Sequence, residues 1–264
     1  FKTDRESTVN ERTVSSFLNF SGIHSYFDLR GVTIEIDTAA VRTADDHNLH
    51  EVAVTGEYLH VQGLTVEDVG NHPRRPGNYA STFGCSGEHC LVQDVRVISR
   101  GSVPYGYGGL LGKGGNAITE LKKKSGFGGA GQDCTYVGCE VFQRSFGHAI
   151  GFGGDHKHRF IDCYVEGERR RTDDILEEER GPAYEADFEN VWNDEKIQPG
   201  DSLSLVEDTI RAYPTKSPQR GHTGGELEVL GCTIKKTRSA VQPLLGFYED
   251  DVYVWGTTLL GNSA

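Results

Sequence analysis

The chain has 264 residues and a formal net charge of −12, with 39 acidic against 27 basic residues. This acidic balance argues against a general nucleic-acid binder, because such proteins need basic surface to neutralise phosphates. No run of 18 apolar residues occurs, so no membrane-spanning helix is predicted, and the 34 glycines, well above the roughly 7% average, favour a fold with many turns.

Seven short apolar stretches follow one template along the chain. Each begins with a glycine or aspartate, and two apolar or small positions follow, separated by one outward-type residue. This alternation has the two-residue period of a half-buried β-strand. In chain order the stretches are residues 31–34, 63–66, 94–97, 138–141, 162–165, 231–234 and 256–259.

The spacing of these stretches predicts a solenoid. The shortest intervals between their second residues are 24 and 25 residues, enough for one coil of a parallel β-helix, and the longer intervals indicate inserted loops. A repeat that cannot bury its own apolar face must stack on its neighbours. We therefore expect an all-β, right-handed parallel β-helix forming a single domain over 1–264. Because the chain begins at Phe1 and ends abruptly, we also expect a trimmed fragment.

The cysteines divide into two groups. Cys139, Cys163 and Cys232 occupy the same template position and are predicted to point inward, as is Cys134. Cys85 and Cys90 flank a short turn, which leaves open whether they form a disulfide or remain free thiols. A zinc site is disfavoured because no second pair has ligand spacing.

Alignment of the coils on the template predicts which side chains become neighbours. Arg100, Arg144 and Glu168 all lie five residues after a template centre, and no gap separates the last two coils, so Arg144 and Glu168 are expected to form an ion pair. By the same count His148 is expected beside Thr172 and Arg171. Residues three positions after the centre form a predicted outward column: Glu35, Glu67, Ile98, Phe142, Glu166 and Lys235.

An insertion is predicted over 172–206, where acidic residues are concentrated. It begins with TDDILEEE, which favours a short helix over 172–179 with Thr172 as its N-cap. Asp173 and Asp174 are interpreted as acidic residues of the first turn, with a catalytic carboxylate pair as the alternative.

The candidate catalytic residues lie in two segments. His148, among small residues in SFGHAIGFGG, can act as acid or base near neutral pH. Arg211 and Tyr213 are one residue apart, so in a strand both point to the same side. An arginine beside a phenol suits β-elimination from a uronate, because the arginine neutralises the carboxylate while the phenol exchanges a proton with the sugar. Lys123 and Lys113 are further candidate bases.

The stacked Gly/Asp-Cys-x-Val stretches, with LLGKGGNAITELKKKSG, FGHAIGFGG, DCYVEGERRRTDD and SLVEDTIRAY, resemble the pectate-lyase-like β-helix superfamily of secreted bacterial carbohydrate-active proteins. The resemblance covers most of residues 50–260. It implies the β-helix fold, and it implies a secreted or periplasmic location. This architecture hosts lyases, hydrolases, epimerases and non-catalytic proteins, so the reaction is less closely specified.

Two enzyme groups of the superfamily can be compared by residue. Polygalacturonases carry an Asp-Asp pair before a Gly-His-Gly stretch, whereas here Asp173 and Asp174 follow His148. Lyases with a calcium ion use a Glu-x-Glu pair, and Glu166-Gly167-Glu168 is similar to it. Calcium prefers oxygen ligands, so the resemblance implies Glu166 and Glu168 as its ligands.

We therefore expect a polysaccharide lyase that acts on an acidic, uronate-containing glycan. His148, Arg211, Tyr213 and Lys123 are its candidate catalytic residues. The predicted substrate-binding residues are Arg100, Lys113, Arg144 and Arg171. A glycoside hydrolase using Asp173, Asp174 or Glu168 is the first alternative, and a non-catalytic glycan-binding or structural protein is the second.

Overall fold

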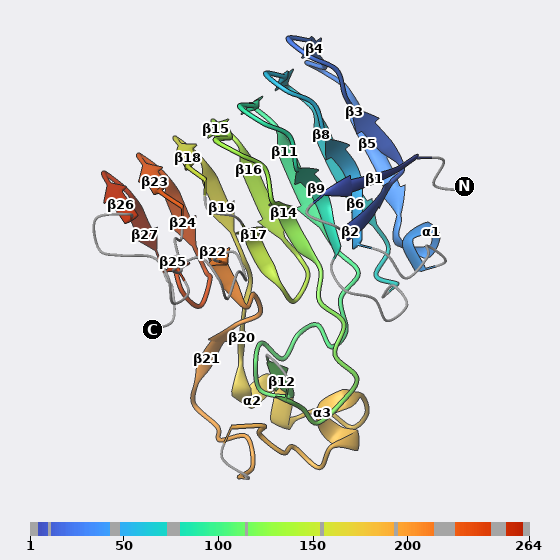
Figure 1. The fold of residues 1–264 in the computed structure, drawn as a ribbon. Coiled ribbons are helices and arrows are strands. Elements are labelled where there is room, and N and C mark those ends of the chain that lie inside the picture. Colours follow the sequence, from blue (N-terminus) through green and yellow to red (C-terminus); the bar gives the residue numbers. More distant parts are fainter. Residues whose placement is uncertain are drawn as a thin grey trace, which may run out of the picture.

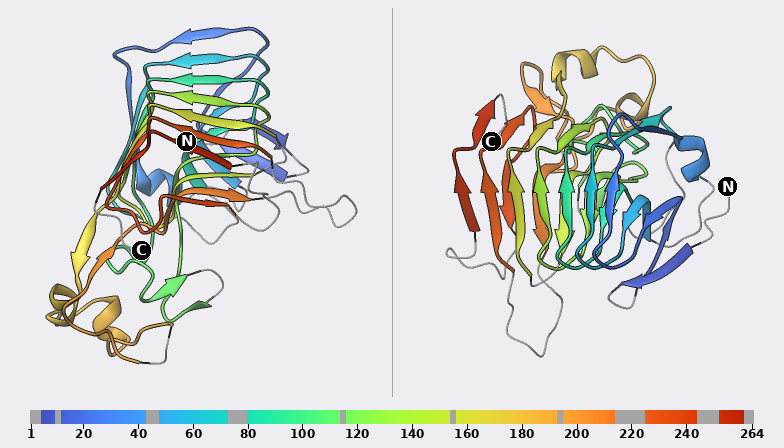
Figure 2. Two further views of the ribbon diagram at one scale, coloured as in Figure 1. Left: turned by 90° about the vertical axis from the view of Figure 1, so that its left-hand side faces the viewer. Right: turned by 90° about the horizontal axis from the view of Figure 1, so that it is seen from above.

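The computed structural model describes residues 5–9, 12–42, 48–72, 80–113, 116–153, 156–192, 195–213, 225–243 and 252–260. Most of the strands belong to three long, largely parallel β-sheets, and successive strands along the chain lie in the three sheets in turn. Figure 2 shows the resulting coils stacked side by side. The architecture is all-β and consistent with a parallel β-helix, as the template predicted.

All seven template stretches contribute to one sheet. Its strands are β5 (Thr33–Asp37), β8 (Thr65–Val69), β11 (Arg96–Ser99), β16 (Glu140–Gln143), β19 (Tyr164–Glu166), β24 (Thr233–Lys235) and β27 (Thr258–Leu260). Their register confirms the alignment, because the first residue of each strand pairs with the first residue of the next. The predicted column from Glu35 to Lys235 is therefore continuous.

The left-handed turn before each of these strands explains the first template position. All seven residues there have φ between 51° and 81°. L-residues with a Cβ atom avoid this region, whereas glycine adopts it freely and aspartate tolerates it. The positions are Gly31, Gly63, Asp94, Gly138, Asp162, Gly231 and Gly256.

Two further sheets close the coils. The second consists of β4 (Tyr26–Asp28), β7 (His60–Gln62), β10 (Leu91–Gln93), β15 (Thr135–Val137), β18 (His158–Ile161), β23 (Leu227–Leu230) and β26 (Val252–Trp255). The third consists of β1 (Arg5–Val9), β2 (Arg12–Ser16), β3 (Leu18–Phe20), β6 (Asn48–Val54), β9 (Ala80–Cys85), β14 (Ser125–Gly129), β17 (His148–Gly153), β22 (Asp208–Tyr213) and β25 (Val241–Pro243). A short helix, α1 (Thr38–Arg42), follows β5.

The three sheets surround one apolar core. Stacked aliphatic and aromatic side chains fill it, among them Phe83, Phe127 and Phe160. Cys139, Cys163 and Cys232 are 1–3% exposed, which confirms that these thiols point inward. Cys85, Cys90 and Cys134 are also buried, and all six cysteines are free. No helix among the described residues is long and apolar enough to cross a membrane.

Two insertions leave the coils and pack together on a small core of their own (Figure 1). The first, between β11 and β14, contains β12 (Gly112–Lys113) and β13 (Asn116–Ala117). The second contains β20 (Arg169–Arg171), α2 (Thr172–Leu176), α3 (Pro182–Glu185) and β21 (Ser202–Ser204). Buried Tyr107 and Leu111 of the first insertion join Ile175, Ala183 and Ile197 of the second.

The predicted helix is present but shorter than expected, and its N-cap was assigned one residue too late. The cap residue is Arg171, which makes no side-chain capping hydrogen bond. Thr172 lies inside the helix, where its hydroxyl accepts a hydrogen bond from the backbone N–H of Asp201 at 3.0 Å. Asp173 and Asp174 do occupy the first helical turn.

Candidate functional site

A cluster of ionisable side chains lies at the starts of adjacent parallel strands of the third sheet. Lys123 lies just before β14, His148 begins β17, Asp208 begins β22 with Glu207 before it, and Arg238 precedes β25. In this register His148 pairs directly with Asp208. The predicted position of His148 beside Thr172 and Arg171 is wrong, because the chain leaves the coil after β19 and returns only at β22.

The backbone before His148 requires glycine. A Cβ atom on Gly147 would lie 2.4 Å from the carbonyl oxygen of Lys124 on the neighbouring coil. The absence of a side chain allows the two coils to approach, and this brings His148 alongside β22.

The two carboxylates of the cluster are buried and paired with cations. Glu207 is 4% exposed and Asp208 is 1% exposed. Lys123 Nζ donates to Glu207 Oε1 at 2.5 Å. Arg238 donates to Asp208 Oδ1 at 2.5 Å, and the Ser239 hydroxyl donates to the same oxygen at 2.7 Å. Burial raises the pKa of Asp208 to about 6, so this carboxylate is ionised at neutral pH.

His148 connects these carboxylates to a phenol. Its Nε2 lies 2.7 Å from the Tyr213 hydroxyl, and its Nδ1 lies 3.6 Å from Asp208 Oδ2. Burial lowers the pKa of His148 to about 4, so the imidazole is neutral at pH 7 and its Nε2 can accept a hydrogen bond from the phenol. The Tyr213 side chain is 38% exposed, which leaves it open to a ligand, and burial raises its pKa.

Several polar atoms of the cluster are buried without a hydrogen-bond partner among the described residues. They are His148 Nδ1, Glu207 Oε2, Asp208 Oδ2 and Arg211 Nε. Buried polar atoms are ordinarily satisfied, and a concentration of exceptions is typical of a functional site. Arg211 lies beside the group, with one guanidinium nitrogen 3.7 Å from Asp208 Oδ2.

The balance of charge favours an anionic ligand. His148, Glu207 and Asp208 each offer a ligand atom within 4.8 Å of the others, so their spacing could hold a metal ion. However, the three cations Lys123, Arg211 and Arg238 outnumber the two carboxylates by one positive charge, and Lys123 and Arg238 each occupy a carboxylate oxygen. A divalent cation would meet repulsion here, whereas a carboxylate or sulfate would be attracted.

The structure brings together all four candidate catalytic residues, His148, Arg211, Tyr213 and Lys123. Glu207 and Asp208 were included in the sequence-based prediction only as part of the segment around Arg211, and Arg238 was not predicted. The residues just before Arg211 did carry a signal, since two adjacent acidic residues, Glu207 and Asp208, stand where the strand begins. Arg238 had none, because a lysine- and arginine-rich turn ordinarily faces solvent.

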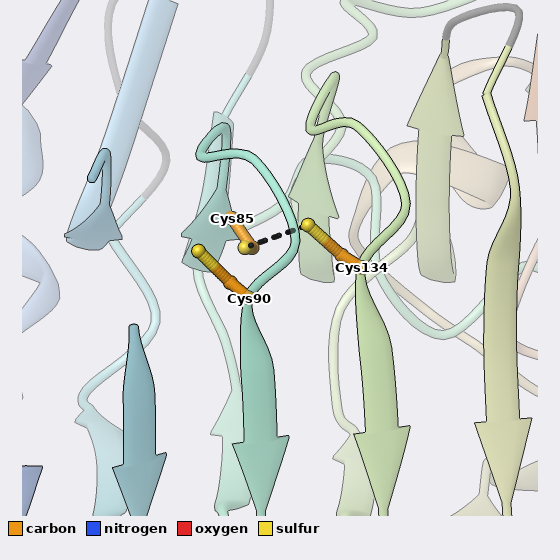
Figure 3. A group of neighbouring side chains, drawn as sticks. All are labelled: Cys85, Cys90 and Cys134. Atoms are coloured by element: carbon orange, nitrogen blue, oxygen red, sulfur yellow. Dashed lines mark hydrogen bonds between the residues drawn. The ribbon is translucent and has the colours of Figure 1, made fainter. Parts of the chain in front are cut away.

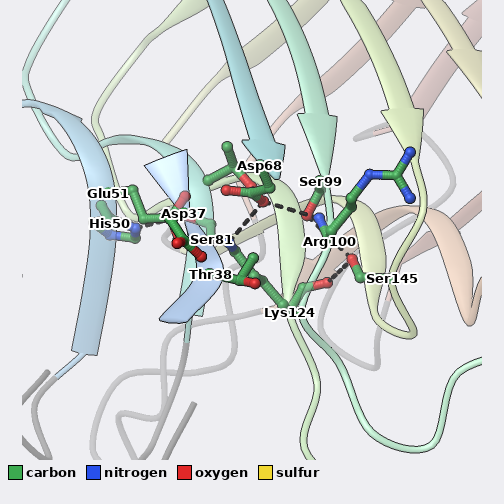
Figure 4. Close-up of polar contacts among 12 residues, drawn as sticks. Asp37, Thr38, His50, Glu51, Asp68, Ser81, Ser99, Arg100, Lys124 and Ser145 are labelled. Atoms are coloured by element: carbon green, nitrogen blue, oxygen red, sulfur yellow. Dashed lines mark hydrogen bonds and ion pairs between the residues drawn. The ribbon is translucent and has the colours of Figure 1, made fainter. Parts of the chain in front are cut away.

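The candidate substrate-binding residues do not form one group. Arg144 Nε lies 3.1 Å from Glu168 Oε1, which confirms the predicted ion pair between adjacent coils. Arg171 is bound by Asp173 on the insertion, at 2.5 Å. Arg100 donates its backbone N–H to Asp68 at 2.9 Å, and its side chain points away from that carboxylate in Figure 4. Lys113 lies in β12.

The two predicted calcium ligands bind other groups. Glu166 accepts hydrogen bonds from Lys236 Nζ, at 2.8 Å, and from the Tyr164 hydroxyl. Glu168 accepts one from the Tyr105 hydroxyl in addition to its ion pair with Arg144. Within the described ranges, neither glutamate belongs to a group of three or more potential metal-ligating side chains.

A second charged cluster is closed off in the interior. Lys124 is 2% exposed, and its ammonium group donates to Glu51 Oε1 at 2.5 Å and to Asp68 Oδ2 at 2.6 Å (Figure 4). Both carboxylates are fully buried, and burial raises the pKa of Glu51 well above its usual range. This cluster joins three coils and has no access for a substrate, so we assign it a structural role.

Comparison with protein-family models and with curated proteins found no match.

Proposed function

We propose that this protein is a polysaccharide lyase that cleaves an acidic, uronate-containing glycan by β-elimination. The observation that carries the proposal is the 2.7 Å contact between the Tyr213 hydroxyl and His148 Nε2, next to the guanidinium group of Arg211. Elimination from a uronate needs a proton acceptor beside a cationic site for the carboxylate, and the cluster supplies both.

In the proposed reaction the phenol oxygen of Tyr213 takes the proton from C5 of the uronate. Its own proton moves to His148 Nε2, and the imidazolium that forms is stabilised by Asp208 and Glu207. The C5–H electron pair forms the C4–C5 double bond, and the bond from C4 to the glycosidic oxygen breaks. That oxygen then receives the proton from the tyrosine–histidine pair, which restores both groups.

The cations have a separate role in the proposed reaction. Removal of the C5 proton shifts negative charge onto the uronate carboxylate, and a neighbouring positive charge lowers the barrier for that step. Arg211 is the best placed, because its guanidinium carbon lies 5.6 Å from the centre of the Tyr213 ring. Lys123 is held by Glu207 and contributes as a charged donor in place of the basic role predicted for it.

We also propose the handedness of the coils, the superfamily and the location of the protein. We assign the coils to a right-handed solenoid of the pectate-lyase-like superfamily, acting outside the cytoplasm where its glycan would be found. The three parallel sheets and the long insertions on one side of the coils support this assignment.

The experiment is a screen of acidic glycans, including polygalacturonate, alginate and glycosaminoglycans. A lyase generates an unsaturated uronate that absorbs in the ultraviolet, together with one new reducing end per cleavage. New reducing ends without that absorbance would identify a hydrolase. Glycan retention with neither product would identify a binding protein. Tyr213→Phe is the matched variant, and it should abolish the absorbance while the glycan is still bound.

A further inference from the structure

Three thiols from two adjacent coils meet at one point of the core. Cys85 ends β9, Cys90 precedes β10, and Cys134 precedes β15 on the next coil (Figure 3). All three are at most 1% exposed. Their sulfur atoms lie within 4.8 Å of one another, and the Cys85 and Cys134 sulfurs are 3.5 Å apart.

The other buried cysteines are arranged differently. Cys139, Cys163 and Cys232 occupy equivalent positions on successive coils, so their sulfurs follow one another in single file. In the first group Cys90 and Cys134 are also successive, but Cys85 reaches them from another sheet. Its thiol completes a triangle of sulfur atoms. Three sulfurs in a triangle can all bind one central ion, whereas three sulfurs in a row cannot.

The turns above the triangle leave room for the sulfurs. A Cβ atom on Gly87 would lie 2.7 Å from Cys90 Sγ, and one on Gly131 would lie 2.8 Å from Cys134 Sγ. Glycine at both positions therefore allows the two thiols to pack directly beneath the turns. Glu88 and His89 of the first turn are exposed, so the turn that covers the sulfurs faces solvent.

We propose that Cys85, Cys90 and Cys134 form a binding site for one soft monovalent metal ion, with Cu(I) as the best match. Metal–sulfur bonds of about 2.3 Å around a three-coordinate ion place the sulfurs about 4 Å apart, which the triangle accommodates. Thiolate sulfur selects soft ions such as Cu(I). Zinc would require a fourth ligand, and the group contains none among the described residues.

Binding involves no change of oxidation state. Each sulfur that bonds to copper loses its S–H proton to solvent, so protons are released and neither an oxidant nor a reductant is consumed. The site is independent of the proposed lyase reaction, since none of its residues belongs to the cluster around His148.

The test uses the full chain, reduced and kept free of oxygen, titrated with Cu(I) in competition with the chelator bathocuproine disulfonate. We expect one equivalent of copper to be withheld from the chelator. Cys134→Ser should weaken binding by at least the roughly 10–100-fold that even an outer-sphere partner contributes. Cys163→Ser is the matched control, because it alters a buried thiol outside the triangle, and it should bind copper as the unaltered chain does.

X-ray absorption of the copper-loaded, unaltered chain tests the site without any variant, and three sulfur neighbours are expected. The proposal would be overturned if the chelator retains all the copper, if Cys163→Ser weakens binding as much as Cys134→Ser, or if copper has nitrogen or oxygen neighbours in place of sulfur. A Cys85–Cys134 disulfide that survives treatment with the reductant, detected by mass spectrometry of the metal-free chain, would also overturn it.

Discussion

The hydroxyl of Tyr213 lies 2.7 Å from Nε2 of His148, although the two residues are 65 positions apart in the chain. They meet because β17 and β22 are adjacent parallel strands, in which Gly153 pairs with Tyr213 and His148 pairs with Asp208. The phenol extends back along the sheet to the imidazole. A hydrogen bond therefore links an exposed side chain to a buried one, and this relationship leads to the first predictions.

Removal of the phenol oxygen should stop the reaction and leave the protein folded. We expect Tyr213→Phe to lower turnover by about 10²-fold or more, the lower end of the effect of general acid–base catalysis, with substrate binding little changed. Steady-state rates and glycan binding measured on the same preparation check this. Tyr253→Phe, which alters another exposed tyrosine on β26, is the control. Normal turnover of Tyr213→Phe would eliminate the phenol as the acid and base.

The guanidinium group of Arg211 should matter through its shape as well as its charge. Arg211→Lys keeps one positive charge but loses the planar fork that can hold a carboxylate by two hydrogen bonds. We expect turnover to fall by about 10²-fold, comparable to the loss of one oxyanion donor. Arg159→Lys, on β18 beside Glu228, is the matched control. Equal activity of both variants would exclude Arg211 from the reaction.

Removal of calcium tests the prediction, made from the sequence, that Glu166 and Glu168 bind a calcium ion. Glu166 and Glu168 are bound by Lys236 and Arg144, so both carboxylates already have cationic partners. We therefore expect activity to be unchanged after dialysis against a calcium chelator. Loss of activity that calcium restores and magnesium does not would instead establish the site predicted at these glutamates.

The buried Lys124 should be critical for stability. Lys124→Met leaves Glu51 and Asp68 in the core without their cation, and we expect the free energy of unfolding to fall by about 3–5 kcal/mol. Denaturant unfolding measures this directly. Lys122→Met is the control, because Lys122 pairs with the exposed Glu120 and should cost less than about 1 kcal/mol. Similar losses in both variants would contradict the assigned role.

Buried histidine should make the fold sensitive to acid. Burial lowers the pKa of His158 to about 4, below the value of 6.5 expected when the chain is unfolded. The unfolded chain therefore binds more protons in this range, so stability is fully present above pH 6.5 and falls as the pH drops towards 4. The difference corresponds to about 3 kcal/mol.

The His158→Phe variant isolates this contribution. His158 packs on Phe152, with ring centres 4.4 Å apart, and neither of its ring nitrogens has a hydrogen-bond partner among the described residues. Phenylalanine should fill the same space, and the loss of stability between pH 6.5 and 4 should become smaller. An identical pH dependence in His158→Phe and the unaltered chain would refute the assignment.

The coils could be predicted from local sequence patterns alone. The Gly/Asp turn residue and the two-residue alternation are local, and each copy carries the full pattern, so the strand register, the inward thiols and the Arg144–Glu168 pair could all be predicted. The candidate catalytic residues could also be predicted from the sequence, because Arg211 and Tyr213 lie one residue apart and His148 lies in a glycine-rich segment.

Which of these residues come into contact depends on the packing of distant segments and could not be predicted from the sequence. Between Glu166 and Asp208 the chain leaves the coils and packs on a core shared with the first insertion. Nothing local marks where the coil resumes, because the return depends on contacts between segments far apart in the chain. Counting straight on from β19 therefore placed His148 beside Thr172. Packing of the insertion instead brings Asp208, and with it Arg211 and Tyr213, to the neighbouring strand.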